Sequence, residues 1–126
     1  MTSVLIVDDQ PAFRRQLHAL LTCAGLDVIA EAGGIPAAEV LVKSLQPDLA
    51  IVDVILPGVS GIEGTPRLKA LAPNMRVILT SAYHEQVLRV SARDAGAEAF
   101  IPKDELDLNV ALKLKETTPP DSNALP

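Results

Sequence analysis

The chain has 126 residues, 48% of them hydrophobic, and 11 basic against 16 acidic residues give it a net charge of −5. This length allows one domain with a sizeable core, and the acidic balance argues against direct contact with nucleic acid or an anionic membrane. The chain begins without a signal-type segment, and no apolar run reaches membrane-spanning length, so we expect a cytoplasmic protein.

Strand-like and helix-like segments alternate along the chain, a pattern typical of a doubly wound α/β domain. Uninterrupted apolar runs rich in β-branched residues predict strands that are buried on both faces of a parallel sheet. The predicted strands are residues 4–7, 26–30, 49–53, 76–81 and 99–101. The predicted helices are residues 11–24, 36–45, 65–71, 85–95 and 104–115.

Two of these helix starts depend on capping residues. Thr65 followed by Pro66 predicts a late start for the third helix, and Asp104 is the predicted cap of the last one. Apolar residues alternate with a period of two between residues 106 and 114, so we expect that helix to keep some apolar surface for a partner. The composition then changes, which divides the chain into a domain over 1–116 and a tail or interdomain linker over 117–126.

Three acidic residues follow two of the predicted strands. Asp8 and Asp9 come directly after the first strand, and Asp53 ends the third. Ligands of open α/β sheets bind at the carboxyl ends of the strands. If these strands are neighbours, the carboxylates converge there and repel one another unless a positive group is bound or one carboxyl stays protonated. The sequence therefore predicts a site for a hard divalent cation, Mg²⁺ in the first place and Mn²⁺ as an alternative.

Further polar residues follow strands that end at the same edge. Thr80 and Ser81 close the fourth strand, and Lys103 follows the fifth. Carboxylates that hold a divalent ion beside a hydroxyl and an ammonium group form an arrangement suited to a phosphoryl group.

These motifs together resemble the receiver domain of two-component response regulators over about residues 3–115. The resemblance is carried by the Asp8-Asp9 pair, Asp53 with Leu56-Pro57-Gly58 and Gly61, Leu79-Thr80-Ser81-Ala82, and residues 96–104. Lys103 followed by Asp104 is most similar to the NarL/FixJ receivers that precede a LuxR-type helix-turn-helix. The resemblance implies a five-stranded (βα)5 flavodoxin-like fold with strand order 2-1-3-4-5. It also implies a signalling module rather than an enzyme.

The resemblance assigns a role to each site residue. Asp53 would accept a phosphoryl group from a sensor histidine kinase or a histidine phosphotransfer protein. Asp9 and Asp53 would bind Mg²⁺ directly, Asp8 mainly through water, and the Ile55 carbonyl would complete the protein ligands. Lys103 would pair with a phosphoryl oxygen.

A hydroxyl, from Ser81 or alternatively Thr80, would bind another phosphoryl oxygen. The family's spacing to Lys103 selects Ser81. The same register makes Phe100 the switch aromatic, whose ring is expected to turn inward when the hydroxyl moves. This movement would remodel the face formed by the last two helices and the strand between them, and we expect a homodimer through that face.

Two departures from the family pattern concern the lifetime of the phosphoryl group. Ile55 and Tyr83 lie two residues after the acceptor and the hydroxyl, at positions that the family uses to tune dephosphorylation. An apolar and a bulky side chain should position an attacking water poorly, so we expect a long-lived phosphoryl state.

Other functions fit less well. A haloacid-dehalogenase-like phosphatase needs an aspartate two residues after its nucleophile, where this chain has Ile55 after Asp53 and Gln10 after Asp8. A phosphorylation-independent interaction domain remains the alternative, although the complete set of site residues argues against it. The Lys103-Asp104 signature also favours a longer protein with a DNA-binding output domain.

Overall fold

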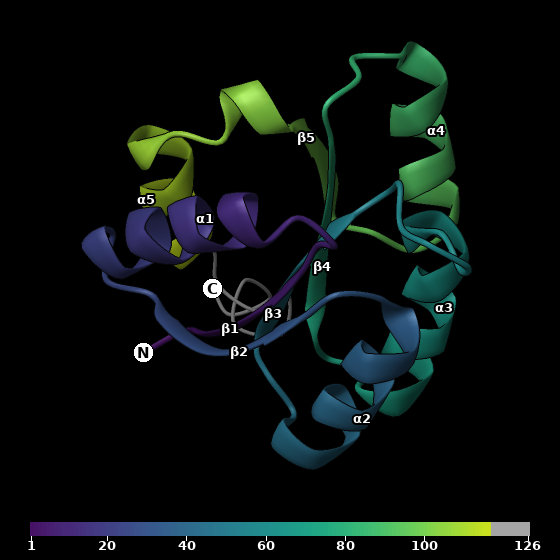
Figure 1. Ribbon diagram of the computed structural model, residues 1–126, viewed down its shortest axis with the longest axis horizontal. Coiled ribbons are helices and arrows are strands. Elements are labelled where there is room, and N and C mark those ends of the chain that lie inside the picture. Colours follow the sequence, from purple (N-terminus) through teal and green to yellow (C-terminus); the bar gives the residue numbers. More distant parts are fainter. Residues whose placement is uncertain (117–126) are drawn as a thin grey trace, which may run out of the picture.

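The computed structural model describes residues 1–116 and contains one sheet of five parallel strands in the order β2-β1-β3-β4-β5 (Figure 1). The predicted tail, 117–126, lies outside the described residues. The strands are β1 (Ser3–Val7), β2 (Asp27–Ala32), β3 (Leu49–Asp53), β4 (Arg76–Ser81) and β5 (Ala99–Pro102). The helices are α1 (Pro11–Cys23), α2 (Ile35–Leu45), α3 (Gly61–Leu71), α4 (Gln86–Asp94) and α5 (Leu108–Glu116), with a 3₁₀ turn at Lys103–Glu105. The predicted fold class and strand order are confirmed.

The sheet separates two apolar layers, because successive strand residues point to opposite faces. Helices α1 and α5 cover one face, and α2, α3 and α4 cover the other (Figure 1). Along β1, Val4 and Ile6 pack toward the first layer, whereas Leu5 and Val7 pack toward the second. All four are almost fully buried, as the uninterrupted apolar run predicts.

The start of α3 differs from the prediction. The helix begins at Gly61 rather than at Thr65, because Ser60 and Glu63 form a capping box. The Ser60 hydroxyl accepts a hydrogen bond from the Glu63 N–H at 3.0 Å, and the Glu63 carboxylate accepts one from the Ser60 N–H at 3.4 Å. Thr65 is buried inside the helix, where its hydroxyl donates to the Gly61 carbonyl at 2.7 Å.

The last helix, in contrast, starts later than predicted. Asp104 lies in the 3₁₀ turn, and α5 begins at Leu108, where the Asp107 carboxylate accepts a hydrogen bond from the Val110 N–H at 2.9 Å. The helix is present, but its predicted cap is wrong. Among residues 1–116, no helix is both long enough and apolar enough to cross a membrane.

Candidate functional site

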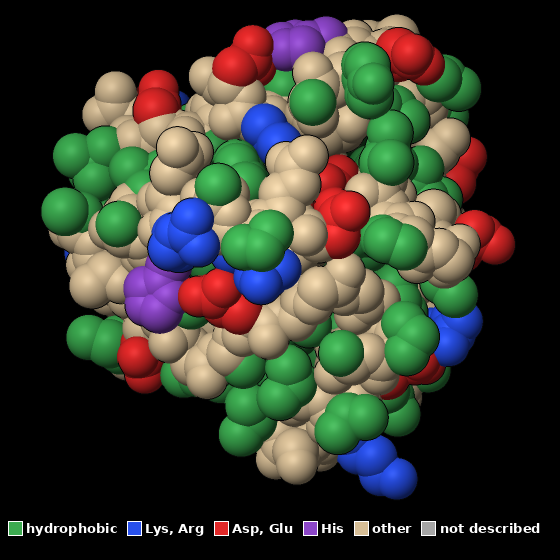
Figure 2. Space-filling view, viewed as in Figure 1, with side chains coloured by type: hydrophobic (Ala, Val, Ile, Leu, Met, Phe, Trp, Pro, Cys, Tyr) green, Lys and Arg blue, Asp and Glu red, His purple; other side chains and the backbone are tan. Residues whose placement is uncertain are grey.

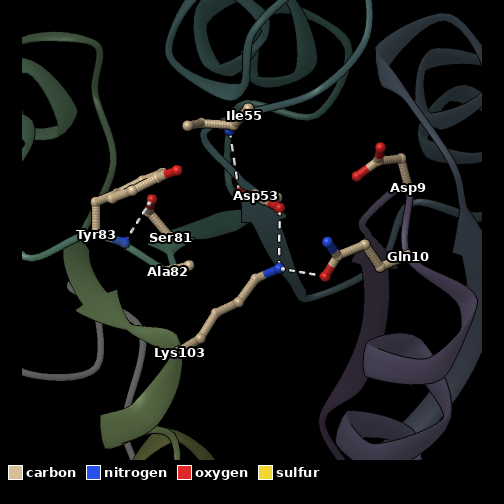
Figure 3. A pocket seen from close by; sticks show the side chains of 8 residues that line it. All are labelled: Asp9, Gln10, Asp53, Ile55, Ser81, Ala82, Tyr83 and Lys103. Atoms are coloured by element: carbon tan, nitrogen blue, oxygen red, sulfur yellow. Dashed lines mark hydrogen bonds and ion pairs between the residues drawn. The ribbon is translucent and has the colours of Figure 1, made fainter.

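A pocket of about 210 Å³ opens at the carboxyl edge of the sheet (Figure 3). It lies where β1, β3, β4 and β5 end, so residues far apart in the sequence meet there. Its lining residues are Asp9, Gln10, Asp53, Ile55, Ser81, Ala82, Tyr83 and Lys103. The prediction placed a site at this edge, and five of its candidate residues line the pocket: Asp9, Asp53, Ile55, Ser81 and Lys103.

The three predicted carboxylates converge. Asp8, Asp9 and Asp53 each offer an oxygen, and these oxygens lie within 4.8 Å of one another. Asp8 and Asp53 are only 1% and 5% exposed, whereas Asp9 is exposed. One oxygen of each buried carboxylate accepts a backbone N–H, from Gln10 to Asp8 at 2.8 Å and from Ile55 to Asp53 at 3.0 Å. The remaining oxygens are left for a cation.

Lys103 provides one cation for this cluster. Its Nζ lies 2.8 Å from Asp8 Oδ2 and 3.0 Å from Asp53 Oδ2. It also donates to Gln10 Oε1 at 3.5 Å, and it lies 4.3 Å from the centre of the Phe13 ring. Figure 3 shows the lysine side chain reaching across the pocket from the end of β5 toward Asp53.

The pocket shifts the pKa values of both Asp53 and Lys103. Burial, together with the nearby negative charge of Asp8, raises the pKa of the Asp53 carboxyl, although the Ile55 N–H and the Lys103 ammonium act in the opposite direction. Burial alone would lower the pKa of Lys103, but the carboxylates of Asp8 and Asp53 outweigh it and hold that pKa above its ordinary value. Lys103 is therefore protonated at neutral pH, and the pocket favours an additional positive group beside Asp53.

The donor set fits a hard divalent cation. Three carboxylates face a single ammonium group, so two negative charges remain uncompensated when all four groups are ionised. Carboxylate oxygens are the ligands that Mg²⁺ prefers in proteins, and they also suit Mn²⁺. Asp9 and Asp53 line the pocket, whereas Asp8 lies beneath it against Lys103.

The two candidate hydroxyls have different surroundings. Ser81 lines the pocket, and its Oγ accepts a hydrogen bond from the Tyr83 N–H at 3.1 Å. Thr80 pairs with Asp53 in the sheet and is 1% exposed, and its hydroxyl has no hydrogen-bond partner among the described residues.

Phe100 is already turned inward in this structure. The ring is 6% exposed, and the Arg89 guanidinium of α4 lies 5.5 Å from the ring centre. Arg89 also donates to the Phe100 carbonyl oxygen at 3.2 Å. The sequence led us to expect an inward ring only after the hydroxyl had moved. Here the ring is inward while the Ser81 hydroxyl still accepts the Tyr83 N–H.

Two contacts near the pocket were missed from the sequence. One is the Phe13 ring against Lys103; its only sequence signal is an aromatic residue in the first turn after the Asp8-Asp9 pair. The other is His84, whose Nε2 lies 2.8 Å from Asp104 Oδ1 in the 3₁₀ turn. No spacing rule links these residues, because the fold alone brings the β4–α4 loop to the end of β5.

The response regulator receiver domain family matches residues 4–113 of the chain. The chemotaxis protein CheY of Thermotoga maritima is 36% identical over 100 residues, which cover 79% of this chain and 83% of that protein. The chain spans about half the length of other curated relatives, among them a DNA-binding transcriptional activator of Mycobacterium tuberculosis, of which it covers 54% at 34% identity.

Solved structures of receiver domains and related proteins have a similar fold. The signal receiver domain of the response regulator NarL from Mycobacterium tuberculosis has a TM-score of 0.82 at 30% identity, covering 90% of this chain and 92% of that one. A complex described as CheX-CheY-BeF3-Mg+2, from Borrelia burgdorferi, has a TM-score of 0.81 at 30% identity, covering 89% and 84% of the two chains.

Proposed function

The chain belongs to the response regulator receiver domain family, and we propose that it accepts a phosphoryl group on Asp53 in two-component signalling. The donor would be the phosphohistidine of a sensor histidine kinase or of a histidine phosphotransfer protein, in the cytoplasm. The observation that carries the proposal is the arrangement of Asp53 in a pocket with Asp9, Ser81 and Lys103.

The reaction is a substitution at phosphorus. An Asp53 carboxylate oxygen attacks, the bond between phosphorus and the histidine nitrogen breaks, and its electron pair leaves with the imidazole. The product is an acyl phosphate. The Ile55 N–H, which binds Asp53 Oδ1, fixes the orientation of the carboxylate so that the other oxygen faces the pocket.

The surrounding residues compensate the charge of the incoming group. Lys103 would exchange its contact with Asp53 for a phosphoryl oxygen, which it can reach because its Nζ lies 3.0 Å from Asp53 Oδ2. Ser81 would release the Tyr83 N–H and donate to a second phosphoryl oxygen, with Thr80 as the alternative donor.

Mg²⁺, or Mn²⁺ in its place, would supply the remaining positive charge and neutralise the phosphoryl oxygens. Asp9 and Asp53 would hold the ion directly, Asp8 would act mainly through water, and the Ile55 carbonyl would complete the protein ligands. The similar structure from Borrelia burgdorferi is described as a complex that contains Mg²⁺, which supports Mg²⁺ as the ion proposed here.

The output would pass through α4, β5 and α5. Phe100 on β5 contacts Arg89 on α4. Because β5 pairs with β4, which carries Ser81, a movement of Ser81 would be transmitted to this face. Val87 and Val90 on α4 are 60% and 42% exposed, and they offer apolar surface for a homodimer.

A further domain could carry the output. The chain matches only about half the length of a DNA-binding relative, which supports an output domain in a longer protein. On the face drawn in Figure 2, acidic and basic side chains are interspersed.

The test is phosphorylation by a small donor. The protein is mixed with Mg²⁺ and acetyl phosphate, and its intact mass is recorded beside that of an Asp53→Asn variant. We expect a gain of one phosphoryl group in the wild type, no gain in the variant, and no gain after chelation. A folded wild type that gains nothing would refute the proposal and leave the phosphorylation-independent interaction domain.

A further inference from the structure

The ring of Phe13 contacts the ammonium group of Lys103, a residue that lines the pocket. Phe13 is the third residue of α1, whereas Lys103 is the first residue after β5. Lys103 Nζ lies 4.3 Å from the centre of the Phe13 ring. The ring is half-buried and packs against the apolar layer beneath α1 and α5, so its position is fixed by the core rather than by the lysine.

The ring completes the surroundings of the ammonium. Lysine has three N–H donors, and the acceptors within reach are Asp8, Asp53 and Gln10 at 2.8, 3.0 and 3.5 Å. The face of an aromatic ring carries partial negative charge and attracts a cation without using a donor. The Lys103 side chain is therefore only 14% exposed although it is charged.

The contacts with Asp8 and Asp53 differ from the contact with the ring in one respect. A divalent cation prefers oxygen ligands, so it competes with Lys103 for the same carboxylates. The ring is not a ligand for such an ion, and its attraction for the ammonium is left unchanged. Phe13 thus remains a partner of Lys103 when the carboxylates are shared.

We propose that Phe13 is a positioning residue, which holds the Lys103 ammonium at the pocket while Asp8 and Asp53 are shared with a divalent cation. This inference rests on the proposed function, because it places Lys103 where a phosphoryl oxygen arrives. Without the ring, the four-carbon stem of Lys103 turns more freely toward solvent.

The contact is tested by NMR of the Lys103 Hε protons, which an aromatic ring at this distance shifts upfield. We expect an upfield shift in the wild type that persists when saturating Mg²⁺ is added. Phe13→Leu should abolish the shift, and Phe13→Tyr should restore it because the ring is kept. Leu20→Ala is the matched control, since Leu20 is also partly buried on α1 and packs against the same apolar layer.

The effect on function is read from the rate of phosphorylation by acetyl phosphate at saturating Mg²⁺. We expect Phe13→Leu to be roughly two- to fivefold slower than wild type, the size of a partly exposed cation–π contact. Phe13→Tyr should recover most of this loss, and Leu20→Ala should react at the wild-type rate.

Three results would overturn the role of Phe13. They are a Lys103 shift that is equal in wild type and Phe13→Leu, a shift that disappears when Mg²⁺ is added, and an equal loss of rate in Phe13→Leu and Leu20→Ala. A wild type that shows the shift but is not phosphorylated would instead refute the proposed function, so the two failures are distinguishable.

Discussion

Replacing Lys103 by methionine tests the charge arrangement at the edge of the sheet. The ammonium lies 2.8 Å from Asp8 Oδ2 and 3.0 Å from Asp53 Oδ2. At an effective dielectric of about 20, each attraction amounts to roughly 5–6 kcal/mol before desolvation is subtracted. Methionine keeps the apolar stem but leaves two buried carboxylates facing one another, with oxygens within 4.8 Å.

The net effect is much smaller than the gross attraction, because three ionised groups lose water when they are buried. Removing one partner of a buried ion pair typically costs about 3–5 kcal/mol. The side chain of Lys103 is still 14% exposed. We therefore expect Lys103→Met to lower the free energy of unfolding by about 3 kcal/mol, the lower end of this range. This value applies to protein without divalent ions.

The assay is urea unfolding at neutral pH, with and without saturating Mg²⁺. The matched control is Lys43→Met, since Lys43 is exposed in the last turn of α2 and its loss should cost only a few tenths of a kcal/mol. Mg²⁺ should stabilise Lys103→Met more than wild type, because no ammonium then competes for the carboxylates. Equal losses in the two variants, or equal gains from Mg²⁺, would refute the reasoning.

Three further outcomes follow from contacts around the site. Gly61→Ala places a methyl group against the Asp53 carbonyl oxygen, so we expect a loss of about 1–3 kcal/mol in urea unfolding; wild-type stability would contradict so close an approach. A hydrogen bond to His18 is the main reason that the pKa of Glu31 lies below its ordinary 4.5, so this carboxylate contributes stability above that pH and loses it as the pH falls through the folded pKa. Glu31→Gln should therefore cost about 0.5 kcal/mol near pH 6 and almost nothing near pH 2, and an equal cost at both would be inconsistent with this linkage. Tyr83→Ala removes a bulky side chain from the pocket wall, so we expect it to shorten the predicted long phosphoryl lifetime about two- to fivefold in a phosphate-release assay, whereas an unchanged lifetime would show that the ring does not hinder water.

The strands and the position of the site were predictable, because they depend on local patterns. Runs such as Val4–Val7 are apolar throughout only when both faces of a strand are covered, and this identifies a parallel sheet. The carboxyl ends of parallel strands share one edge, so the convergence of Asp8, Asp9 and Asp53 follows from the order of the strands.

The start of α3 was not predictable from local propensity. Gly61 and Gly64 are poor helix formers, and they conceal the capping box of Ser60 and Glu63. Tertiary contacts require both glycines, because a side chain at Gly61 would meet the Asp53 carbonyl and one at Gly64 would meet Ile35. These glycines are needed for packing and not for helix formation, and a single sequence does not reveal such packing contacts.

The contacts of Lys103 with Phe13 and of Arg89 with Phe100 escaped prediction for a related reason. Lys103 and Phe13 lie on elements that are distant in the chain, whereas Arg89 and Phe100 lie on the consecutive elements α4 and β5. Both contacts depend on the angle at which a helix lies on the sheet. A sequence pattern indicates which face of a helix is apolar, but it does not fix that angle to the accuracy that a ring contact needs.

The separation of the core into two layers has a consequence for how such proteins diverge. Substitutions beneath α1 and α5 repack around Val4 and Ile6, whereas those beneath α2, α3 and α4 repack around Leu5 and Val7. We therefore expect a substitution on one side to need few compensating changes on the other. Chimeras that exchange α1 and α5 together between relatives should therefore fold.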